Sequence, residues 1–482
     1  SELKTILRNC RNQSRTKSLT ACAATLTARL VKDGYINSRV FILEEPIPGS
    51  LEVVEGRISE LKISSPNKRL EKYIYRKLDY LVGTVLHLPT LEKSLFEVKA
   101  IPGIGLISGN LGRLGSDPTQ AVLELTIDPI PSNWHGEIAI NNQGNAGTGE
   151  WRTSGTFSKQ SYFFPDDNLL TYLEVDNDND KELGAIITSS SYSIPLNNNW
   201  TASGSLGYST RQMVESKGEA HEISFSALQG SLQIERNLIK SPTNQFSIFA
   251  ALSTSKNSGF LNDQAAPLVL GGGRKGILKT GIFRTGINFY GAKKLLNWNG
   301  NLYGIHGISA FSTKSQLKNL SNFGIVPGEA KAIGGTGNLS WIINSKTKIN
   351  ISGGIQEAFN PLISSMGFSL GNDTGMKGLP GSLTSGDSGW MISGEVPFKI
   401  WSKDDETIEA IPFMGKGKVW TEINNSKSED QVGSVGLTFR YNKPSLSIEL
   451  GLVDSFDTKD NSGVWNKWML SDGLFTKITY RF

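Results

Sequence analysis

The chain has 482 residues, which is too long for one ordinary domain and fits two to four domains or one large β structure with additions. Its 49 basic and 45 acidic residues are spread along the sequence and leave a net charge of only +4, so we expect no nucleic-acid-binding surface. No apolar run reaches the roughly 18 residues of a transmembrane helix, so the protein is either soluble or crosses a membrane with alternating β-strands.

Residues 1–55 predict a small α/β domain. A helix is expected in SLTACAATLTARLVKDGY, with Gly34 as its stop. Two short β-rich runs follow, RVFIL and LEVVEG. Because no opening strand precedes the helix, we expect the sequence to begin inside this domain. The helix has one apolar stripe, formed by Leu19, Cys22, Leu26 and Leu30.

Residues 56–131 predict a second α/β domain with a fuller plan. GRISELKIS is typical of a strand, and RLEKYIYRKLDYLVG and LPTLEKSLFEVKAIPG are typical of helices. Two more strands are expected in GLISGNL and AVLELTID. The predicted order is therefore β-α-α-β-β.

Cysteine and histidine usage bears on compartment and cofactors. Cys10 and Cys22 are the only cysteines, and their spacing suits one disulfide in an oxidising compartment, with two reduced thiols as the alternative. The four histidines are far apart and CxxC is absent, so no metal is expected. GGGRKG and GIGLISG have only partial phosphate-loop or dinucleotide-loop spacing, so we expect no cofactor.

From residue 132 to residue 482 the helical pattern disappears. Short alternating runs such as NLLTYLEV, WTASGSLGYS and LSIELGLVDS are broken by Asn, Gly, Asp and Ser clusters. A soluble sandwich or propeller gives a similar pattern, but the length also fits an antiparallel transmembrane β-barrel of about 16 strands. The last strand, GLFTKITYRF, alternates and ends at Phe482, with Tyr480 on the same face, and it resembles the sorting signal of bacterial outer-membrane barrels.

Four segments together resemble the outer-membrane transporters of two-partner secretion, which export filamentous haemagglutinins and haemolysins. They are NNQGNAGTGEW, SYSIPLNNNW, GFSLGNDTGMKGLPGSLTSGDSGWMISGE and PFMGKGKVW. The two N-terminal units resemble polypeptide-transport-associated (POTRA) domains, so the resemblance covers nearly the whole chain. It implies POTRA domains at 1–55 and 56–131 and a 16-stranded barrel at 132–482.

The tetrapeptide GDSG at Ser388 invites comparison with chymotrypsin-like proteases. Such an enzyme needs a histidine base, a buried aspartate and usually GDSGG, whereas Trp390 follows Gly389 here and no histidine segment resembles that family's site. We therefore expect no catalytic residue and no enzyme. The glycines suit a loop folded back into a barrel, where backbone approaches the wall closely.

The resemblance implies a pore loop around 371–390 that faces a wall strand. In that family a loop arginine pairs with a wall aspartate, but here those positions are Lys377 and Gly415, so this pair cannot form. Two alternatives follow: Lys377 lies inside the barrel near another carboxylate, with Asp387 and Glu395 nearest in sequence, or the loop is more mobile than in the family. The implied loop motif comprises Gly375, Met376, Lys377, Gly378, Leu379, Gly386, Asp387, Gly389 and Trp390, and the wall residues are Phe413, Gly415 and Gly417.

The implied function is translocation of a large partner exoprotein across the bacterial outer membrane. The POTRA domains would stand in the periplasm and capture the passenger in extended form, and the barrel would conduct it. Expected partners are the passenger, outer-membrane lipid and, during biogenesis, the barrel-assembly machinery; a monomer is expected. The alternatives are a barrel-assembly factor, for which more than two POTRA units would be typical, a passive porin-like channel, and a repurposed barrel.

Overall fold

The computed structural model describes residues 8, 16–43, 45, 50–101, 103–130, 134–179, 182–214, 222–241, 243–423, 426–456 and 468–482. The chain forms two compact units. Unit 1 comprises Ser1–Asn133 and Gln160–Asp167, and unit 2 comprises Trp134–Lys159 and Asn168–Phe482. Within the described part, no helix is long and apolar enough to cross a membrane.

Unit 1 contains two small sheets and three α-helices among its described residues. β1 and β2 pair antiparallel, and a second sheet has the order β3-β5-β4, with β3 parallel to β5 and β4 antiparallel to it. The elements are α2 (Thr16–Lys32), β1 (Arg39–Leu43), β2 (Ser50–Val54), β3 (Arg57–Ser64), α3 (Lys68–Leu78), η1 (Asp79–Leu81), α4 (Leu88–Lys99), β4 (Ile104–Arg113) and β5 (Gln120–Pro129).

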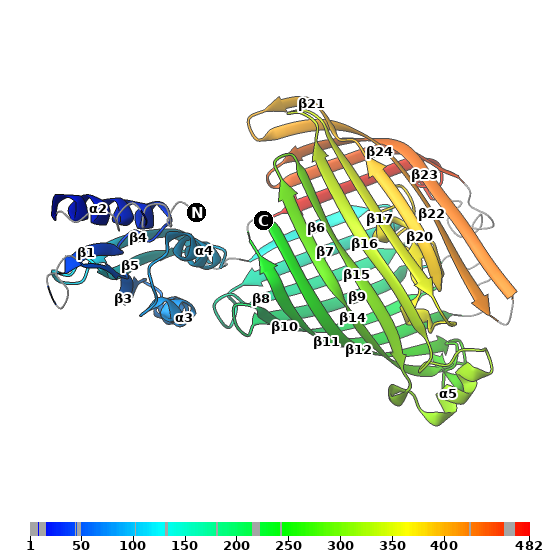
Figure 1. Ribbon diagram of the computed structural model, residues 1–482. Coiled ribbons are helices and arrows are strands. Elements are labelled where there is room, and N and C mark those ends of the chain that lie inside the picture. The colour runs from blue at the N-terminus through cyan, green and yellow to red at the C-terminus, as the bar shows by residue number, and fades with distance from the viewer. Residues whose placement is uncertain are drawn as a thin grey trace. The chain divides into compact units, whose positions relative to one another are not determined.

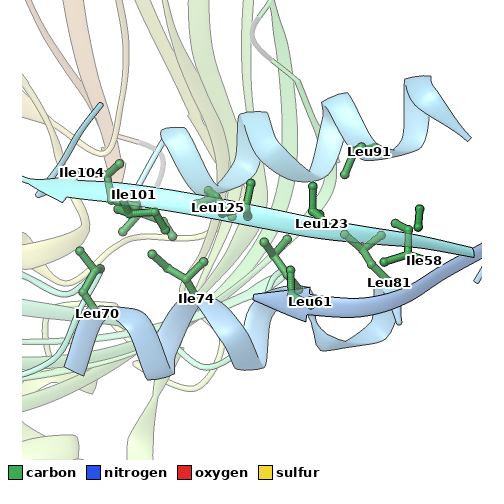
Figure 2. Close-up of a cluster of buried hydrophobic side chains, with 14 of the residues drawn as sticks. Ile58, Leu61, Leu70, Ile74, Leu81, Leu91, Ile101, Ile104, Leu123 and Leu125 are labelled. Atoms are coloured by element: carbon green, nitrogen blue, oxygen red, sulfur yellow. The ribbon is translucent and has the colours of Figure 1, made fainter. Parts of the chain in front are cut away.

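The main core of unit 1 lies between α3, α4 and the three-stranded sheet. Asn67 caps α3, its side-chain oxygen accepting from the N–H groups of Arg69 and Leu70 at 3.1 and 3.2 Å. Figure 2 shows Ile74 of α3 pointing toward the side chains of β3 and β5, and Ile74 has no exposed surface. The periodic apolar positions of both helices are thus buried on one face.

The order β3-α3-α4-β4-β5 confirms the β-α-α-β-β plan predicted for residues 56–131. Cys22 is buried in α2, whereas Cys10 lies outside the described residues. The predicted disulfide, and the division of unit 1 into two domains at residue 55, stay predictions.

Unit 2 is a closed barrel, and its described residues include one short α-helix, α5, at one end (Figure 1). Its elements are β6 (His135–Asn141), β7 (Trp151–Gln160), β8 (Asn168–Asn177), β9 (Leu183–Pro195), β10 (Trp200–Gln212), β11 (Ile223–Lys240), β12 (Asn244–Leu261), β13 (Gln264–Ala265), η2 (Gly273–Lys275), β14 (Ile277–Lys293), β15 (Leu296–Ile308), η3 (Ser309–Phe311), α5 (Lys314–Ser321), β16 (Lys331–Ile342), β17 (Lys348–Ala358), η4 (Ser364–Met366), β18 (Phe368–Leu370), η5 (Asn372–Thr374), β19 (Thr384–Gly386), β20 (Ser388–Glu395), β21 (Phe398–Lys403), β22 (Glu406–Ile423), β23 (Ser426–Lys443), β24 (Leu446–Phe456) and β25 (Leu474–Arg481).

The barrel wall has 16 strands, as predicted. β13 adds no wall strand because β12 pairs directly with β14, and β20 and β21 are two parts of one strand because both pair with β22. The first and last strands close the wall, with Ile138 of β6 opposite Tyr480 of β25. Closure leaves no open sheet edge, which a wall in contact with lipid requires.

Strand alternation separates the two faces of the wall. On neighbouring strands β10 and β11, Leu206 and Leu232 are each 69% exposed on the outer face. Ser205 and Ser231 lie one residue away on the inner face, with hydroxyl oxygens 2.7 Å apart. An apolar outer face around a polar interior is typical of an outer-membrane barrel.

Candidate pore and its lumen loop

Residues 359–387, which join β17 to β20, fold into the barrel interior; we call this segment the lumen loop. Within it β18 and β19 pair as a short hairpin. Leu370, Met376 and Leu379 have no exposed surface and pack with apolar side chains from the inner face of the wall. Those wall side chains are Met391, Val419 and Val432.

Glycine allows the lumen loop to lie against the wall. Gly378 has a φ of 83°, and a Cβ there would stand 2.3 Å from Cγ2 of Val453 on β24. A Cβ on Gly386 of the loop would stand 2.8 Å from the carbonyl oxygen of Trp420 on β22. Loop and wall backbones therefore approach more closely than larger side chains would permit.

Lys377 is held by a charge network on β22 to β24. Its Nζ donates to Oε2 of Glu449 at 2.8 Å, and Arg440 Nε donates to Oε1 of the same carboxylate at 2.9 Å. Arg440 also lies 3.6 Å from Glu409. The Lys377 ammonium lies 5.3 Å from the ring centre of Phe475, close enough for a cation–π contact. Two cations and two carboxylates thus balance in a confined site.

The partner of Lys377 is therefore Glu449, and neither Asp387 nor Glu395 takes that place. Asp387 instead accepts from the N–H of Leu362 at 3.1 Å, and Glu395 accepts from Asn350 at 2.9 Å. Lys377 thus pairs with a carboxylate other than position 415, as expected, but with neither of the two nearest in sequence, because strand register, not chain distance, brings β24 beneath the loop.

A second charge network holds the lumen loop to β7 and β8. Arg152 donates from Nη1 to Asp373 at 2.7 Å and from Nε to Asp176 at 3.0 Å. Its Nη2 lies 3.3 Å from Glu174, an ion-pair distance without hydrogen-bond geometry. Arg152, Glu174 and Asp176 have almost no exposed side chain, whereas the side chain of Asp373 is 47% exposed. Arg152 thus links buried wall carboxylates to the loop.

The connection between β6 and β7 adds neutral contacts to this network. Asn145 accepts from the N–H of Ser382 at 2.9 Å, and the N–H of Gly381 donates to the Gly144 carbonyl at 3.0 Å. Gln143 reaches the Leu379 carbonyl at 3.3 Å. The segment 141–151 therefore forms part of the surface that holds the lumen loop, a role that the sequence did not predict.

The end of the lumen loop is fixed to β17 and β22. Gln356 donates to the carbonyls of Met366 and Asp387 at 2.8 and 2.9 Å, and the Asp387 N–H donates to Thr421 at 2.9 Å. The Ser388 hydroxyl accepts from the N–H of Ala358 at 2.9 Å. Ser388 thus has a structural hydrogen bond at the junction of loop and wall.

The structure brings most of the predicted motif together. Met376 to Leu379 lie in the lumen beside Phe413 and Gly415, and a Cβ on Gly417 would stand 2.6 Å from Leu370. Gly386 and Gly389 lie at the loop's return to the wall, each too close to a neighbour for a Cβ. Trp390 differs, because alternation on β20 turns it to the outer face. Tyr480 and Phe482 are also outward and about half exposed. Within the described ranges, no group of three or more His, Cys, Asp or Glu could hold a metal.

Fold and lumen loop define a class: an outer-membrane β-barrel with an N-terminal POTRA-type region and a loop folded into its pore. Solved structures share this fold. CdiB from Escherichia coli matches with a TM-score of 0.74 at 16% identity, over 100% of this chain and 87% of that chain. CdiB from Acinetobacter baumannii matches with a TM-score of 0.67 at 15% sequence identity, over 100% of this chain and 86% of that chain. BamA from Haemophilus ducreyi, lacking POTRA domains 1–3, matches with a TM-score of 0.59 at 10% sequence identity, over 98% of this chain and 94% of that chain.

The sequence matches the haemolysin secretion/activation protein ShlB/FhaC/HecB family over residues 121–440, and the chain belongs to that family. Two relatives are named outer membrane transporter CdiB. The one from Dickeya dadantii (strain 3937) is 26% identical over 137 residues, which is 28% of this chain and 23% of the relative. The one from Escherichia coli is 24% identical over 156 residues, 29% of this chain and 24% of the relative. These alignments span about a quarter of each relative's length.

Proposed function

We propose that this protein exports one partner exoprotein in extended form through the barrel, and that the lumen loop is the movable part that opens the path. The observation that carries the proposal is a loop that lies inside a polar barrel and is held to its wall by ion pairs and hydrogen bonds near Arg152 and Lys377, in addition to the apolar contacts of Leu370, Met376 and Leu379. The hydrogen bonds can exchange for bonds to water or to passenger backbone at low net cost.

The lumen beside the loop supports passage of an unfolded chain. A cavity of about 480 Å³ there is lined largely by hydroxyl and amide side chains from β9 to β12. Arg284 of β14 is the one charged side chain in this lining; the other polar groups are uncharged and let a polypeptide slide without fixed binding sites. These include Ser189, Ser191, Ser205, Gln229, Ser231, Ser253 and Ser255.

Unit 1 offers a docking edge for the passenger. β4 pairs with β5 on one side and has no strand on its other side in the described part of unit 1, and most of its residues are exposed. An extended segment can add there through main-chain hydrogen bonds with little demand on sequence. We propose that unit 1 lies in the periplasm and that the protein is a monomer. Folding of the passenger outside the cell would give transport its direction.

The direct test is co-expression with a candidate large exoprotein from the same genome, followed by measurement of its release. A photo-crosslinking residue at Asn110 on β4 should capture the passenger, while the same residue at exposed Lys72 on α3 should not. Equal capture at both positions would contradict docking on β4.

Two other functions predict different outcomes. A barrel-assembly factor needs its first and last strands to separate, so a disulfide between Ile138→Cys and Tyr480→Cys across the seam should abolish insertion of other barrels but leave export intact. A passive porin does not need unit 1, so its conductance should survive deletion of residues 1–131 and no export should be detected with any neighbouring exoprotein.

A further inference from the structure

The outer face of strands β9 to β14 carries an apolar groove with two lysines at its border. We propose that this groove binds a phosphate-bearing lipid, with an acyl chain against the wall and the phosphate on Lys256 and Lys279. The proposal concerns the lipid-facing side of the wall and is independent of the lumen and of export.

The groove follows a row of small residues across the strands. Leu206 of β10 lies opposite Gly230 of β11, which lies opposite Thr254 of β12, which lies opposite Gly281 of β14. The glycines leave this row shallow between larger apolar side chains, giving a hollow of about 590 Å³. Its apolar lining comes from Leu169, Tyr192, Leu206, Leu232, Leu252 and Phe311.

Phe311 forms one end of the groove. It comes from η3, directly after β15, and its ring covers Gly281: a Cβ at that position would stand 2.1 Å from Phe311 Cδ2. An aromatic ring placed on the outside of the wall, over a glycine, extends the apolar surface of the groove. The ring itself remains more than one third exposed and is available to a ligand.

The lysine pair occupies the next row of outward residues, on the side toward α5. Lys256 of β12 lies directly opposite Lys279 of β14, and both side chains are exposed. Like charges directly opposite each other on neighbouring strands repel, with Cβ atoms about 4.5–5.5 Å apart. In the described residues neither lysine has an ion-pair partner, so an anion between them would relieve the repulsion.

The surrounding charge is also positive. α5 follows Ser312, whose hydroxyl donates to the Lys279 carbonyl at 2.6 Å, so the helix begins beside the lysine pair. The exposed acidic residues next to this end of β11, β12, β16 and β17, which are Glu222, Asp263, Glu329 and Glu357, form no ion pair with the lysines. The exposed basic residues of this end are Arg274, Lys275, Lys314, Lys318 and Lys331.

A lipid fits both halves of this surface. Leu206 and Leu232, each 69% exposed, face acyl chains in an outer-membrane barrel, and lysines at the border of such a face reach the phosphate level of the membrane. A free anion would use the lysines but leave the groove unused. A zwitterionic lipid would use the groove but gain little from the paired cations.

The test is native mass spectrometry of the full chain in an uncharged detergent, titrated with diphosphorylated lipid A. One saturable site is expected. Lys256→Gln with Lys279→Gln should weaken binding about 10- to 30-fold, because each lysine near an anionic lipid contributes roughly fivefold. The matched control, Lys293→Gln with Lys294→Gln at the other end of β14, should leave binding unchanged.

The groove is tested separately with Gly230→Val. A Cβ at Gly230 stands 3.5 Å from Leu206, so the change fits the wall and fills the hollow without altering charge. Weaker lipid binding is expected, with heat-modifiable migration verifying that every variant has a closed barrel. Three results would each overturn the proposal: equal lipid A binding by the Lys256/Lys279 variant and the Lys293/Lys294 control, binding of phosphatidylcholine as tight as that of lipid A, or full competition by inorganic phosphate.

Discussion

Arg152 on β7 and Asp373 in the lumen loop are joined by a hydrogen-bonded ion pair of 2.7 Å, with the cation on the wall and the carboxylate on the loop. This is the reverse of the loop arginine and wall aspartate that the family resemblance implied. Lys377 keeps a loop cation but pairs with Glu449 instead of position 415. The loop is therefore held to two separate parts of the wall by pairs of opposite polarity.

Removing the two partners of the first pair should have unequal effects. Asp373→Asn should cost at most about 1 kcal/mol in unfolding free energy, because that carboxylate is 47% exposed. Arg152→Gln should cost about 3–5 kcal/mol, because it leaves Glu174 and Asp176 buried without a cation. Urea unfolding measures both, and planar-bilayer conductance should rise in Asp373→Asn as the loop loosens. Equal destabilisation would contradict this account of Arg152.

The family pair can be rebuilt beside the present one. Lys377→Arg with Gly415→Asp should change conductance or export more than the sum of the single changes, with a coupling of about 0.5–3 kcal/mol. The new side chain requires only a small shift of the neighbouring strand, since a Cβ on Gly415 would stand 3.3 Å from Ser393 Cβ and 3.8 Å from Met376 Cα.

The same cycle in a Glu449→Gln background serves as its control. Without the Glu449 carboxylate the new arginine has no competing partner on β24, so the coupling should grow. Strictly additive effects in both backgrounds would show that position 415 does not sense the loop cation.

Sequence patterns predicted the wall and its closure because alternation and the terminal aromatic are local properties. The register of Ile138 with Tyr480 follows once both end strands are recognised. The partners of the loop were not predictable in the same way: Lys377 and Glu449 are 72 residues apart, and Arg152 and Asp373 are 221 apart. One local signal for the wall side of this network was available. Alternation places the charged side chains of Arg152, Glu174 and Asp176 on the inner face of two strands that follow NNQGNAGTGEW.

Gly378 should tolerate no side chain while the loop is seated. Its φ of 83° disfavours other residues, and a Cβ would collide with Val453 at 2.3 Å. Gly378→Ala should displace the loop and raise both conductance and protease cleavage between residues 359 and 387. Gly337→Ala on β16 is the matched control, because a Cβ there meets its nearest neighbour at 3.7 Å. Unchanged conductance in Gly378→Ala would mean that the loop leaves this position readily.

Cys10 and Cys22 are predicted to form a disulfide that ties the segment before α2 to the helix. Alkylation of the folded, oxidised protein should modify neither thiol, and both should react after reduction. Cys22→Ser is expected to lower the melting temperature of unit 1, because loss of a disulfide from a small domain typically costs about 2–5 kcal/mol. Two reactive thiols before reduction would contradict the pairing.

The last residue is expected to matter more for barrel assembly than for final stability. The backbone N–H groups of Phe482 and Gly136 each donate to the carbonyl of the other residue at 3.1 Å. The ring of Phe482 packs against Gly136, where an added Cβ would stand 2.9 Å from the ring's Cζ. Deleting Phe482 removes the terminal aromatic that resembles the sorting signal and opens the seam at its end. The heat-modifiable fraction in membranes should therefore fall several-fold. Leu474→Ala, an outward apolar change at the other end of β25 with the terminus intact, is the control and should leave that fraction nearly unchanged. If both variants assemble equally well, the terminal aromatic is not the recognised feature of this strand.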